Sequence, residues 1–308
     1  MNISYILPLQ RSWSRAVRML FRPFEIGKWF VLGFAAFLSE YLSWGYSGSR
    51  SHYERHPVVI PHEALMRVAE FLRNPLGMTL VLWILLCALA VGVLFMWISS
   101  RGKFILLENV VHEQAGIVEP WKRFQRIGNS LFAWRLGFSL VCLLIVGAMI
   151  LPFAATIAAL VSQNAFHPAD LLVLVPLVAM LAPFGIVFAY TLLFLNSFVV
   201  PIMYRDGLSA LTAWRRFLDV FRVHPMAFVV FGLFSLALTV MVGFAIVAFG
   251  MATCCIGFFL LSLPYIGSVL LLPVELTARA LGPEFLSQFG PAYTMMVEHV
   301  PPQPPPRP

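Results

Sequence analysis

The stretch that decides the fold class is residues 76–98, which read LGMTLVLWILLCALAVGVLFMWI. It contains no Asp, Glu, Lys or Arg, and a helix of about 20 apolar residues is long enough to cross the roughly 30 Å of hydrocarbon in a bilayer. The apolar residues run continuously and do not alternate with polar ones, which favours a helix over a membrane strand. This stretch therefore predicts a transmembrane helix.

The composition of the whole chain agrees with this prediction. Of its 308 residues, 60% are hydrophobic and 11% are charged, whereas a soluble domain has about 45–50% apolar and about 25% charged residues. These values exclude a soluble globular enzyme and a disordered chain. The net charge is +7. In a membrane protein such an excess of basic residues sets the orientation of the helices in the bilayer and favours contact with anionic lipid. It does not indicate nucleic-acid binding, because no segment is long enough to form a soluble basic domain.

The sequence predicts an all-α integral membrane protein with about six transmembrane helices arranged as three hairpins. The six apolar stretches lie near 29–46, 76–98, 133–161, 171–203, 226–252 and 254–278. The first stretch is the weakest, because it is short and contains Glu40. The third and fourth are longer than the bilayer is thick, so we expect tilt or kinks there. The candidate kink positions are Pro152, Pro176, Pro183 and Pro264.

Basic residues set the orientation of the six helices, because loops rich in Lys and Arg stay in the cytoplasm. In this topology 17 of the 21 Lys and Arg residues lie on one side of the membrane. The other four are Arg50, Arg55, Arg67 and Arg73, which fall in the single long loop on the opposite side. The sequence therefore predicts a multi-pass protein of the cell inner membrane with both termini in the cytoplasm.

A pattern of one basic amphipathic helix followed by a hairpin occurs three times. The strings Trp121-Lys122-Arg123-Phe124 and Trp214-Arg215-Arg216-Phe217 align directly, and Trp13-Ser14-Arg15-Ala16 is a looser match. We predict one helical membrane domain over 1–293, with units of about 11–104, 115–206 and 208–293, and a Pro-rich cytoplasmic tail over 294–308. The alternative to a true internal repeat is that the three helices resemble one another only because any cytoplasmic linker of such a protein is basic and amphipathic.

The basic faces of these three helices are predicted to lie at the membrane surface, with cations toward the headgroups. In the first helix the arginines share one face, and Trp13, Val17, Leu20 and Phe24 occupy the other. The predicted membrane-surface residues are Arg11, Arg15, Arg18, Arg22, Lys122, Arg123, Arg126, Arg215 and Arg216. Their predicted partners are membrane lipids, anionic at the cytoplasmic face.

Several short strings along the chain are distinctive: Phe21-Arg22-Pro23-Phe24, Lys28-Trp29-Phe30, Glu119-Pro120-Trp121, Pro201-Ile202-Met203, Leu263-Pro264-Tyr265-Ile266-Gly267, Leu272-Pro273 and Phe289-Gly290-Pro291. They resemble a family of bacterial multi-pass membrane proteins known only as a domain of unknown function, and the likeness covers most of residues 11–293. The resemblance implies an inner-membrane location and a helical fold, and it supplies no catalytic residue. More remotely, the layout is similar to the membrane domain of some glycerophosphodiester phosphodiesterases. Their soluble catalytic domain has no counterpart here, so their activity is not implied.

No motif for catalysis or cofactor binding is found, and we predict no catalytic residue, cofactor or resident metal. His112-Glu113 begins like a zinc-protease motif, but the second histidine one turn later is missing. We expect His112 and Glu113 to be a solvated pair in a cytoplasmic loop. His52, His56 and His62 in the outer loop have metal-binding chemistry, but the prolines around them favour a solvated loop.

Polar and ionisable residues inside the apolar stretches are costly in a bilayer and are therefore candidate functional residues. These intramembrane residues are Glu40, Arg135, Asn196, Glu275 and Arg279. Glu40 and Arg135 are expected to extend toward the interface, and Asn196 to form a hydrogen bond between helices. Glu275 is expected to pair with Arg279 on its own helix, and the alternative partner is Arg135.

The function favoured by these observations is that of a non-enzymatic scaffold or lipid-organising protein. The alternative is a transporter or channel component for a small solute or lipid, and a membrane-embedded lipid enzyme is a third possibility. A polar, water-filled cavity that opens to one side would favour transport, whereas an apolar lateral groove would favour lipid handling.

Overall fold

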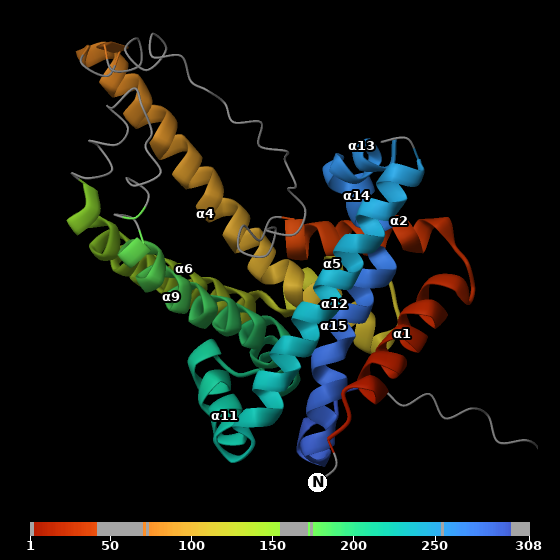
Figure 1. The fold of residues 1–308 in the computed structure, drawn as a ribbon. Coiled ribbons are helices and arrows are strands. Elements are labelled where there is room, and N and C mark those ends of the chain that lie inside the picture. The colour runs from red at the N-terminus through yellow and green to blue at the C-terminus, as the bar shows by residue number, and fades with distance from the viewer. Residues whose placement is uncertain are drawn as a thin grey trace, which may run out of the picture.

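The computed structural model describes residues 3–41, 70–71, 74–154, 172, 175–253 and 256–296. Within these ranges every regular element is a helix (Figure 1). The prediction of an all-α protein is therefore confirmed for the described part of the chain.

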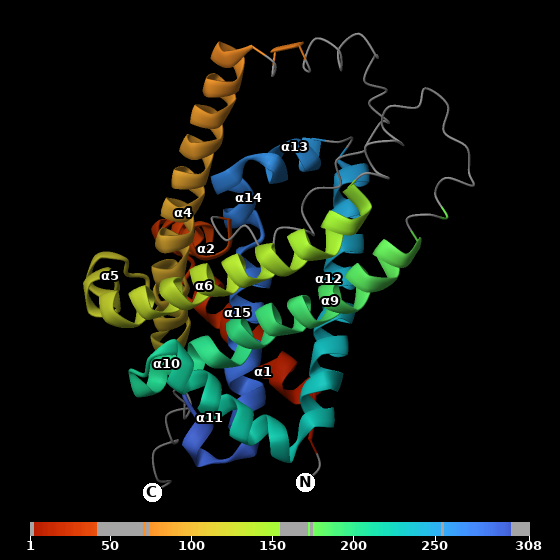
Figure 2. The ribbon, with the colours of Figure 1, turned by 90° about the vertical axis from the view of Figure 1, so that its left-hand side faces the viewer.

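Four helices are long and apolar enough to cross a membrane. They are α4 (Pro75–His112), α6 (Gln125–Ile150) with its 3₁₀ turn Leu151–Phe153, α9 (Val175–Phe194) with its continuation to Asp206, and α12 (Pro225–Ala252). Figure 2 shows α6 and α9 side by side. Of the candidate kink positions, Pro152 lies in the 3₁₀ turn after α6, whereas Pro183 lies inside the continuous helix α9.

The first and last predicted spans differ from the expectation of six continuous helices. The first contains α2 (Ile26–Ala36) and a π-helical turn, η1 (Phe37–Tyr41), and residues 42–46 lie outside the described ranges. The last is broken into α13 (Ile256–Ser262), α14 (Pro264–Leu270) and α15 (Leu272–Leu286). Proline stands in the first turn of both α14 and α15, where its missing N–H costs no helical hydrogen bond. The stretch 254–278 is therefore not one continuous helix within the described residues, and one of its breaks falls at the candidate kink position Pro264.

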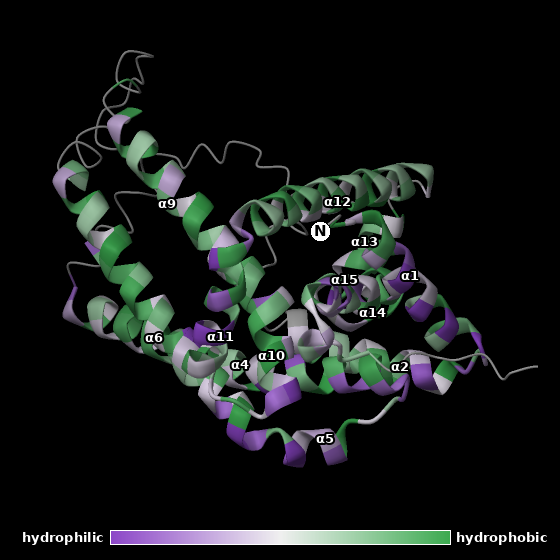
Figure 3. Ribbon diagram, turned by 90° about the horizontal axis from the view of Figure 1, so that it is seen from below, coloured by the Kyte–Doolittle hydropathy of each residue, from purple (hydrophilic) through white to green (hydrophobic). Residues whose placement is uncertain are grey.

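Two of the three predicted basic helices form as α1 (Ile6–Phe21) and α11 (Ala210–Val223). The second is divided at Phe124 between the short α5 (Val118–Arg123) and the start of α6, which carries Arg126. Ser209 is the N-cap of α11 and its side chain accepts a hydrogen bond from the N–H of Thr212. A positive φ at Gly207 ends the preceding α10 (Val200–Asp206), where glycine adopts the left-handed conformation without strain. In Figure 3, hydrophobic residues dominate α9 and α12, and hydrophilic residues are concentrated in α1 and α5.

The core forms where three helical segments meet: the C-terminal third of α4, the π-helical turn η4 (Leu195–Val199) with α10, and α15. Each of these segments contacts the other two. Gly282 of α15 permits this approach, because a Cβ there would lie 2.0 Å from the carbonyl oxygen of Ser197 in η4. Gly102 of α4 does the same beside η1, where a Cβ would lie 2.8 Å from the carbonyl carbon of Leu38. Both π-helical turns therefore lie at close backbone contacts.

Candidate functional site

A chain of hydrogen bonds between buried polar side chains joins η1, α4, α6 and α15. Ser99 Oγ donates to the carbonyl oxygen of Ser39 at 3.0 Å, and Arg279 Nη2 donates to Ser39 Oγ at 2.5 Å. Arg135 Nη1 donates to Ser99 Oγ at 3.3 Å and to Ser100 Oγ at 3.0 Å. Two of the predicted intramembrane cations, Arg135 and Arg279, are thus linked through two serines.

Lys103 extends this polar region toward α9. Its side chain is only 1% exposed, and Nζ donates to Oδ1 of Asn196 in η4 at 2.5 Å. Burying an ammonium group is costly unless the group is hydrogen-bonded or paired. The structure places Asn196 in a hydrogen bond between helices, as the sequence suggested. The sequence reading missed Lys103, because this residue lies beyond the apolar stretch and was counted among the cytoplasmic loop cations.

A cavity of about 440 Å³ lies beside these polar groups, between α12 and α15. One face of α12 lines it with Phe231, Ser235, Leu238, Val242 and Ile246, which recur every three or four residues. The facing side of α15 contributes residues between Leu271 and Leu281, and α1 and the end of α9 complete the wall. We call this space the lateral cavity.

Most of the lining of the lateral cavity is apolar, and polar side chains are set among the apolar ones. Phe231 and Phe285 of α15 have ring centroids 4.6 Å apart, so the start of α12 lies close to the end of α15. Leu271, Val274 and Ile246 belong to the apolar part of the lining, and Glu275, in the first turn of α15, directly follows Val274. The polar lining residues are Asn196, Ser197, Ser235, Thr239, Glu275, Thr277 and Arg279.

The lateral cavity opens on the outer surface of the helices. Met241 and Trp13 line it and are 60% and 50% exposed. The neighbouring surface of α12 carries further exposed large apolar side chains, among them Leu236 and Phe244. A molecule that enters the cavity from this side therefore arrives across an apolar surface.

The structure brings three of the five predicted intramembrane residues together at this cavity: Asn196, Glu275 and Arg279. Arg135 is joined to them through the serine chain, and the side chain of Glu40 lies outside the described part. Glu275 is half-buried in the first turn of α15. Its pairing with Arg279 or Arg135 stays a prediction.

Arg15 corrects the expectation that the arginines of α1 face the headgroups. It is only 5% exposed, with Nη1 at 3.2 Å from Glu113 Oε1 and Nη2 at 3.8 Å from Glu284 Oε1. The reason is that α1 packs along α15, and its buried face includes Ser12, Ala16 and Leu20 as well as Arg15. Burial of this guanidinium requires the nearby carboxylates.

Glu113 also differs from the expected solvated pair with His112. Its backbone adopts the left-handed conformation, with φ of 52°, and ends α4. Its carboxylate forms ion pairs with Arg15 and with Arg18, whose Nη2 lies 3.5 Å away.

The other predicted surface cations have side chains that reach the surface. Those classed as exposed are Arg11, Arg22, Lys122, Arg123, Arg126 and Arg215, and Arg18 and Arg216 are half-buried.

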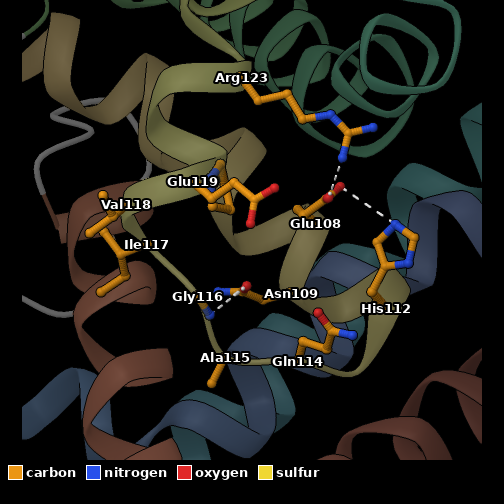
Figure 4. A pocket seen from close by; sticks show the side chains of 11 residues that line it. Glu108, Asn109, His112, Gln114, Ala115, Gly116, Ile117, Val118, Glu119 and Arg123 are labelled. Carbon is orange, nitrogen blue, oxygen red and sulfur yellow. Dashed lines mark hydrogen bonds and ion pairs between the residues drawn. The ribbon is translucent and has the colours of Figure 1, made fainter.

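A second cavity, of about 610 Å³, lies where the loop after α4 folds back toward α5 (Figure 4). Glu108 accepts a hydrogen bond from Arg123 at 2.9 Å and another from the Tyr204 hydroxyl, and His112 Nε2 lies 3.7 Å from its carboxylate. Asn109 Oδ1 accepts from the N–H of Gly116 at 3.1 Å. These contacts fasten the loop to the end of α4.

The polar side chains that line the second cavity are Glu108, Asn109, His112, Gln114, Glu119 and Arg123. Among the described residues that line it there is no serine, threonine or cysteine to act as a nucleophile. Across the described ranges, no group of three or more His, Cys, Asp or Glu side chains is arranged to hold a metal ion. The predicted His52, His56 and His62 cluster and residues 297–308 of the tail lie outside those ranges.

Comparison with known proteins gives one match. The model of a family described as "Family of unknown function (DUF7544)" matches residues 6–297. No curated protein and no solved structure matches the chain.

Proposed function

The chain belongs to this family of unknown function, and from that premise we propose that it is an integral membrane protein that binds a lipid molecule in the lateral cavity. The observation that carries the proposal is the lining of that cavity, which is mostly apolar, includes a few polar and charged side chains, and reaches the exposed apolar surface at Trp13 and Met241. A lipid likewise combines a large apolar part with a small polar headgroup. The protein then acts as a non-enzymatic, lipid-organising component of a bacterial inner membrane.

The length of the apolar wall supports a lipid chain as the occupant. On α12 the mainly apolar lining runs from Leu238 to Ile246, which corresponds to about 12 Å at 1.5 Å per residue. The hydrocarbon core of a bilayer is about 30 Å thick, so this wall is about as long as one leaflet is deep. An acyl chain from one leaflet therefore fits along it.

The distribution of basic residues supports an orientation for the bound lipid. Figure 2 shows α10 and α11 at one end of the molecule, and these helices carry Arg205, Arg215, Arg216 and Arg222. Cytoplasmic loops are rich in such residues. On α12 the polar lining residues Ser235 and Thr239 lie closer along the helix to α11 than Val242 and Ile246 do, and on this ground we orient the headgroup toward the cytoplasmic leaflet. Both chain termini are then cytoplasmic.

The mutual packing of three segments supports a repeat of three related units. The C-terminal third of α4, the η4–α10 segment and α15 each lie at the C-terminal end of the second helix of a predicted hairpin, and each contacts the other two. Such an arrangement is expected of three units around a pseudo-threefold axis normal to the membrane. The three units would thus enclose the core, and the lateral cavity would lie between the second and third.

A transporter or channel component remains the alternative, and one observation favours it. Lys103, Arg135 and Arg279 are connected to buried serine and asparagine side chains, and buried charges in membrane proteins often mark ion or proton pathways. Solute flux into vesicles that contain the protein, abolished by Lys103→Met, would support this alternative over lipid binding.

The experiment that tests lipid binding fills the cavity. Val242→Trp places a large side chain in the lining, and Val240→Trp makes the same change two residues away, at a position that is 50% exposed and does not line the cavity. Full-length protein from phospholipid nanodiscs is examined by native mass spectrometry. We expect one retained lipid in the wild type and in Val240→Trp, and its loss in Val242→Trp. Equal retention in both variants would contradict the proposal.

A further inference from the structure

We infer that a second lipid site lies on the surface where α4, α5 and α6 meet (Figure 2), and that it binds the phosphate of an anionic phospholipid. We call this surface the junction site, and its residues are Trp97, Arg101, Trp121, Arg126 and Asn129. None of them lines the lateral cavity, so the junction site goes beyond the proposed function and does not depend on it.

Asn129 of α6 is held with its amide oxygen against α4. Trp97 Nε1 donates to Oδ1 of Asn129 at 3.2 Å, and Arg101 Nη2 donates to the same atom at 3.0 Å. An indole N–H and a guanidinium are donors only, so the atom that they share must be the oxygen. The amide nitrogen Nδ2 is then directed away from both donors, and Asn129 is an exposed residue. Its two N–H groups therefore suit an acceptor that arrives at the surface, such as a phosphate oxygen.

Arg101 brings a buried positive charge to this amide. It is only 8% exposed, and its Cζ lies 4.2 Å from the centre of the Trp97 ring and 5.3 Å from that of Trp121. Gly128 permits this packing, because a Cβ there would lie 2.8 Å from Arg101 Cγ. Aromatic faces attract a cation but carry no net negative charge. Within the described ranges no carboxylate forms an ion pair with Arg101, so its charge favours an anion beside it.

Two exposed cations belong to the same region. Arg126 lies three residues before Asn129 on α6, and positions with this spacing are neighbours on a helix surface. Lys122 directly follows Trp121 in α5. Both cations are exposed, and neither forms an ion pair with any residue that the structure describes. Together with Arg101 they favour a headgroup that carries a net negative charge.

The apolar surface that leads to the junction site favours a lipid over a free anion. Leu94, Trp97 and Arg101 follow one another at intervals of three and four residues, so they lie on one face of α4. Leu94 is 50% exposed, and the apolar stretch of α4 ends at Ile98, within one turn of Arg101. Tryptophan is enriched at the boundary between hydrocarbon and headgroups. An acyl chain that lies against the exposed face of α4 therefore places its phosphate near Asn129.

The test compares two lipid probes on the full-length protein in phosphatidylcholine nanodiscs. Both probes carry a diazirine at the same acyl carbon, close to the headgroup; one is a phosphatidylglycerol and the other a phosphatidylcholine. The sample is illuminated without a detergent wash, because a lipid on the outer surface exchanges with the bilayer, and mass spectrometry maps the adducts. Hydrogen bonds to a charged group are strong enough for a yield at Trp97, Trp121 or Arg126 that is about tenfold higher with phosphatidylglycerol.

Asn129→Asp is the decisive variant. Its carboxylate still accepts from Trp97 and Arg101, but it repels a phosphate and no longer donates to it, so the preference for phosphatidylglycerol should disappear. Gln10→Glu makes the same change of charge at an exposed position of α1, and this control should keep the preference. Arg126→Gln should lower the preference about fivefold, the effect expected of one cation near the membrane surface.

Equal yields from the two probes in the wild type, or an unchanged preference in Asn129→Asp, would overturn the junction site and leave lipid binding in the lateral cavity intact. A preference at the junction site without any lipid retained in the cavity would overturn only the proposed function. Excess inorganic phosphate should leave the adduct yield unchanged, and suppression by phosphate alone would show that the junction site takes a free anion instead of a lipid. Should Asn129→Asp fail to fold, Arg126→Gln still decides the question, because Arg126 is exposed.

Discussion

Arg15 in α1 and Glu113 at the end of α4 form an ion pair across 98 residues of sequence, with Nη1 at 3.2 Å from Oε1. Arg18 reaches the same carboxylate at 3.5 Å. One residue that ends a long helix thus holds a second helix in place, and that second helix contributes Leu9 and Trp13 to the wall of the lateral cavity.

Removing the charge of Glu113 is expected to destabilise the protein. Glu113→Gln leaves the buried Arg15 with less compensation, and we expect the free energy of unfolding to fall by about 2 kcal/mol, below the full value for a buried pair because Glu113 is partly exposed. Thermal unfolding in detergent measures the change. Glu25→Gln is the matched control, because the exposed Glu25–Lys28 pair is worth at most about 1 kcal/mol. Equal effects of the two substitutions would contradict this role of Glu113.

Gly282→Ala is expected to disturb the contact between α15 and η4. The added Cβ would lie 2.0 Å from the carbonyl oxygen of Ser197, a backbone atom that moves only with its helix. We expect a loss of about 1–3 kcal/mol in the free energy of unfolding, as in other overpacked cores. At Gly137 nothing lies within 4 Å of an added Cβ, so Gly137→Ala should be neutral or stabilising. A neutral Gly282→Ala would show that the close approach is not required.

The partner of Glu275 is decided by charge exchange. We predict a pair with Arg279, four residues later on the same helix. Glu275→Arg and Arg279→Glu should each lower the melting temperature, and the double variant should recover part of the loss. Recovery in the combination of Glu275→Arg with Arg135→Glu, and not in the first double variant, would identify the interhelical pair instead.

The exposed cations of α1 are expected to contact anionic lipid. Replacing Arg11 and Arg22 with Gln should weaken the association of dansyl-labelled phosphatidylglycerol with the protein in nanodiscs, by about 1 kcal/mol for each residue at low salt. Energy transfer from tryptophan to the dansyl group reports the association. Replacing the exposed Gln10 and Ser14 with Ala is the control. No difference between the two double variants would show that apolar contacts alone attract the lipid.

Much of the fold follows from local sequence patterns. Continuous apolar stretches predicted α4, α6, α9 and α12, because a helix that crosses hydrocarbon needs apolar residues along its whole length. The high cost of polar groups in such stretches also singled out Asn196, Glu275 and Arg279, which line one cavity in the structure.

Other features depend on contacts between distant segments. The apolar stretch ends at Ile98, yet α4 continues to His112, and its C-terminal part, which mixes polar residues with apolar ones such as Phe104 and Ile105, is buried among neighbouring helices that include α10 and α15. The same burial makes Lys103 an interior residue. Arg15 is buried because Glu113 and Glu284 come from other helices. Hydropathy along the chain reports none of these contacts.

The central claim, a lipid held in the lateral cavity, is tested most directly by photo-crosslinking in the full-length protein. A phosphatidylglycerol with a diazirine near the end of one acyl chain is incorporated into nanodiscs. One sample is illuminated directly, and a second is washed with detergent, which removes loosely bound lipid, and is then illuminated. Mass spectrometry maps the adducts in both samples. The account predicts that adducts on the cavity-lining residues Val242, Ile246, Leu271 or Val274 form in both samples, and that adducts on the outward-facing Val240 and Phe244 form only without the wash. Equal loss of adducts from both sets of residues after the wash would contradict the account.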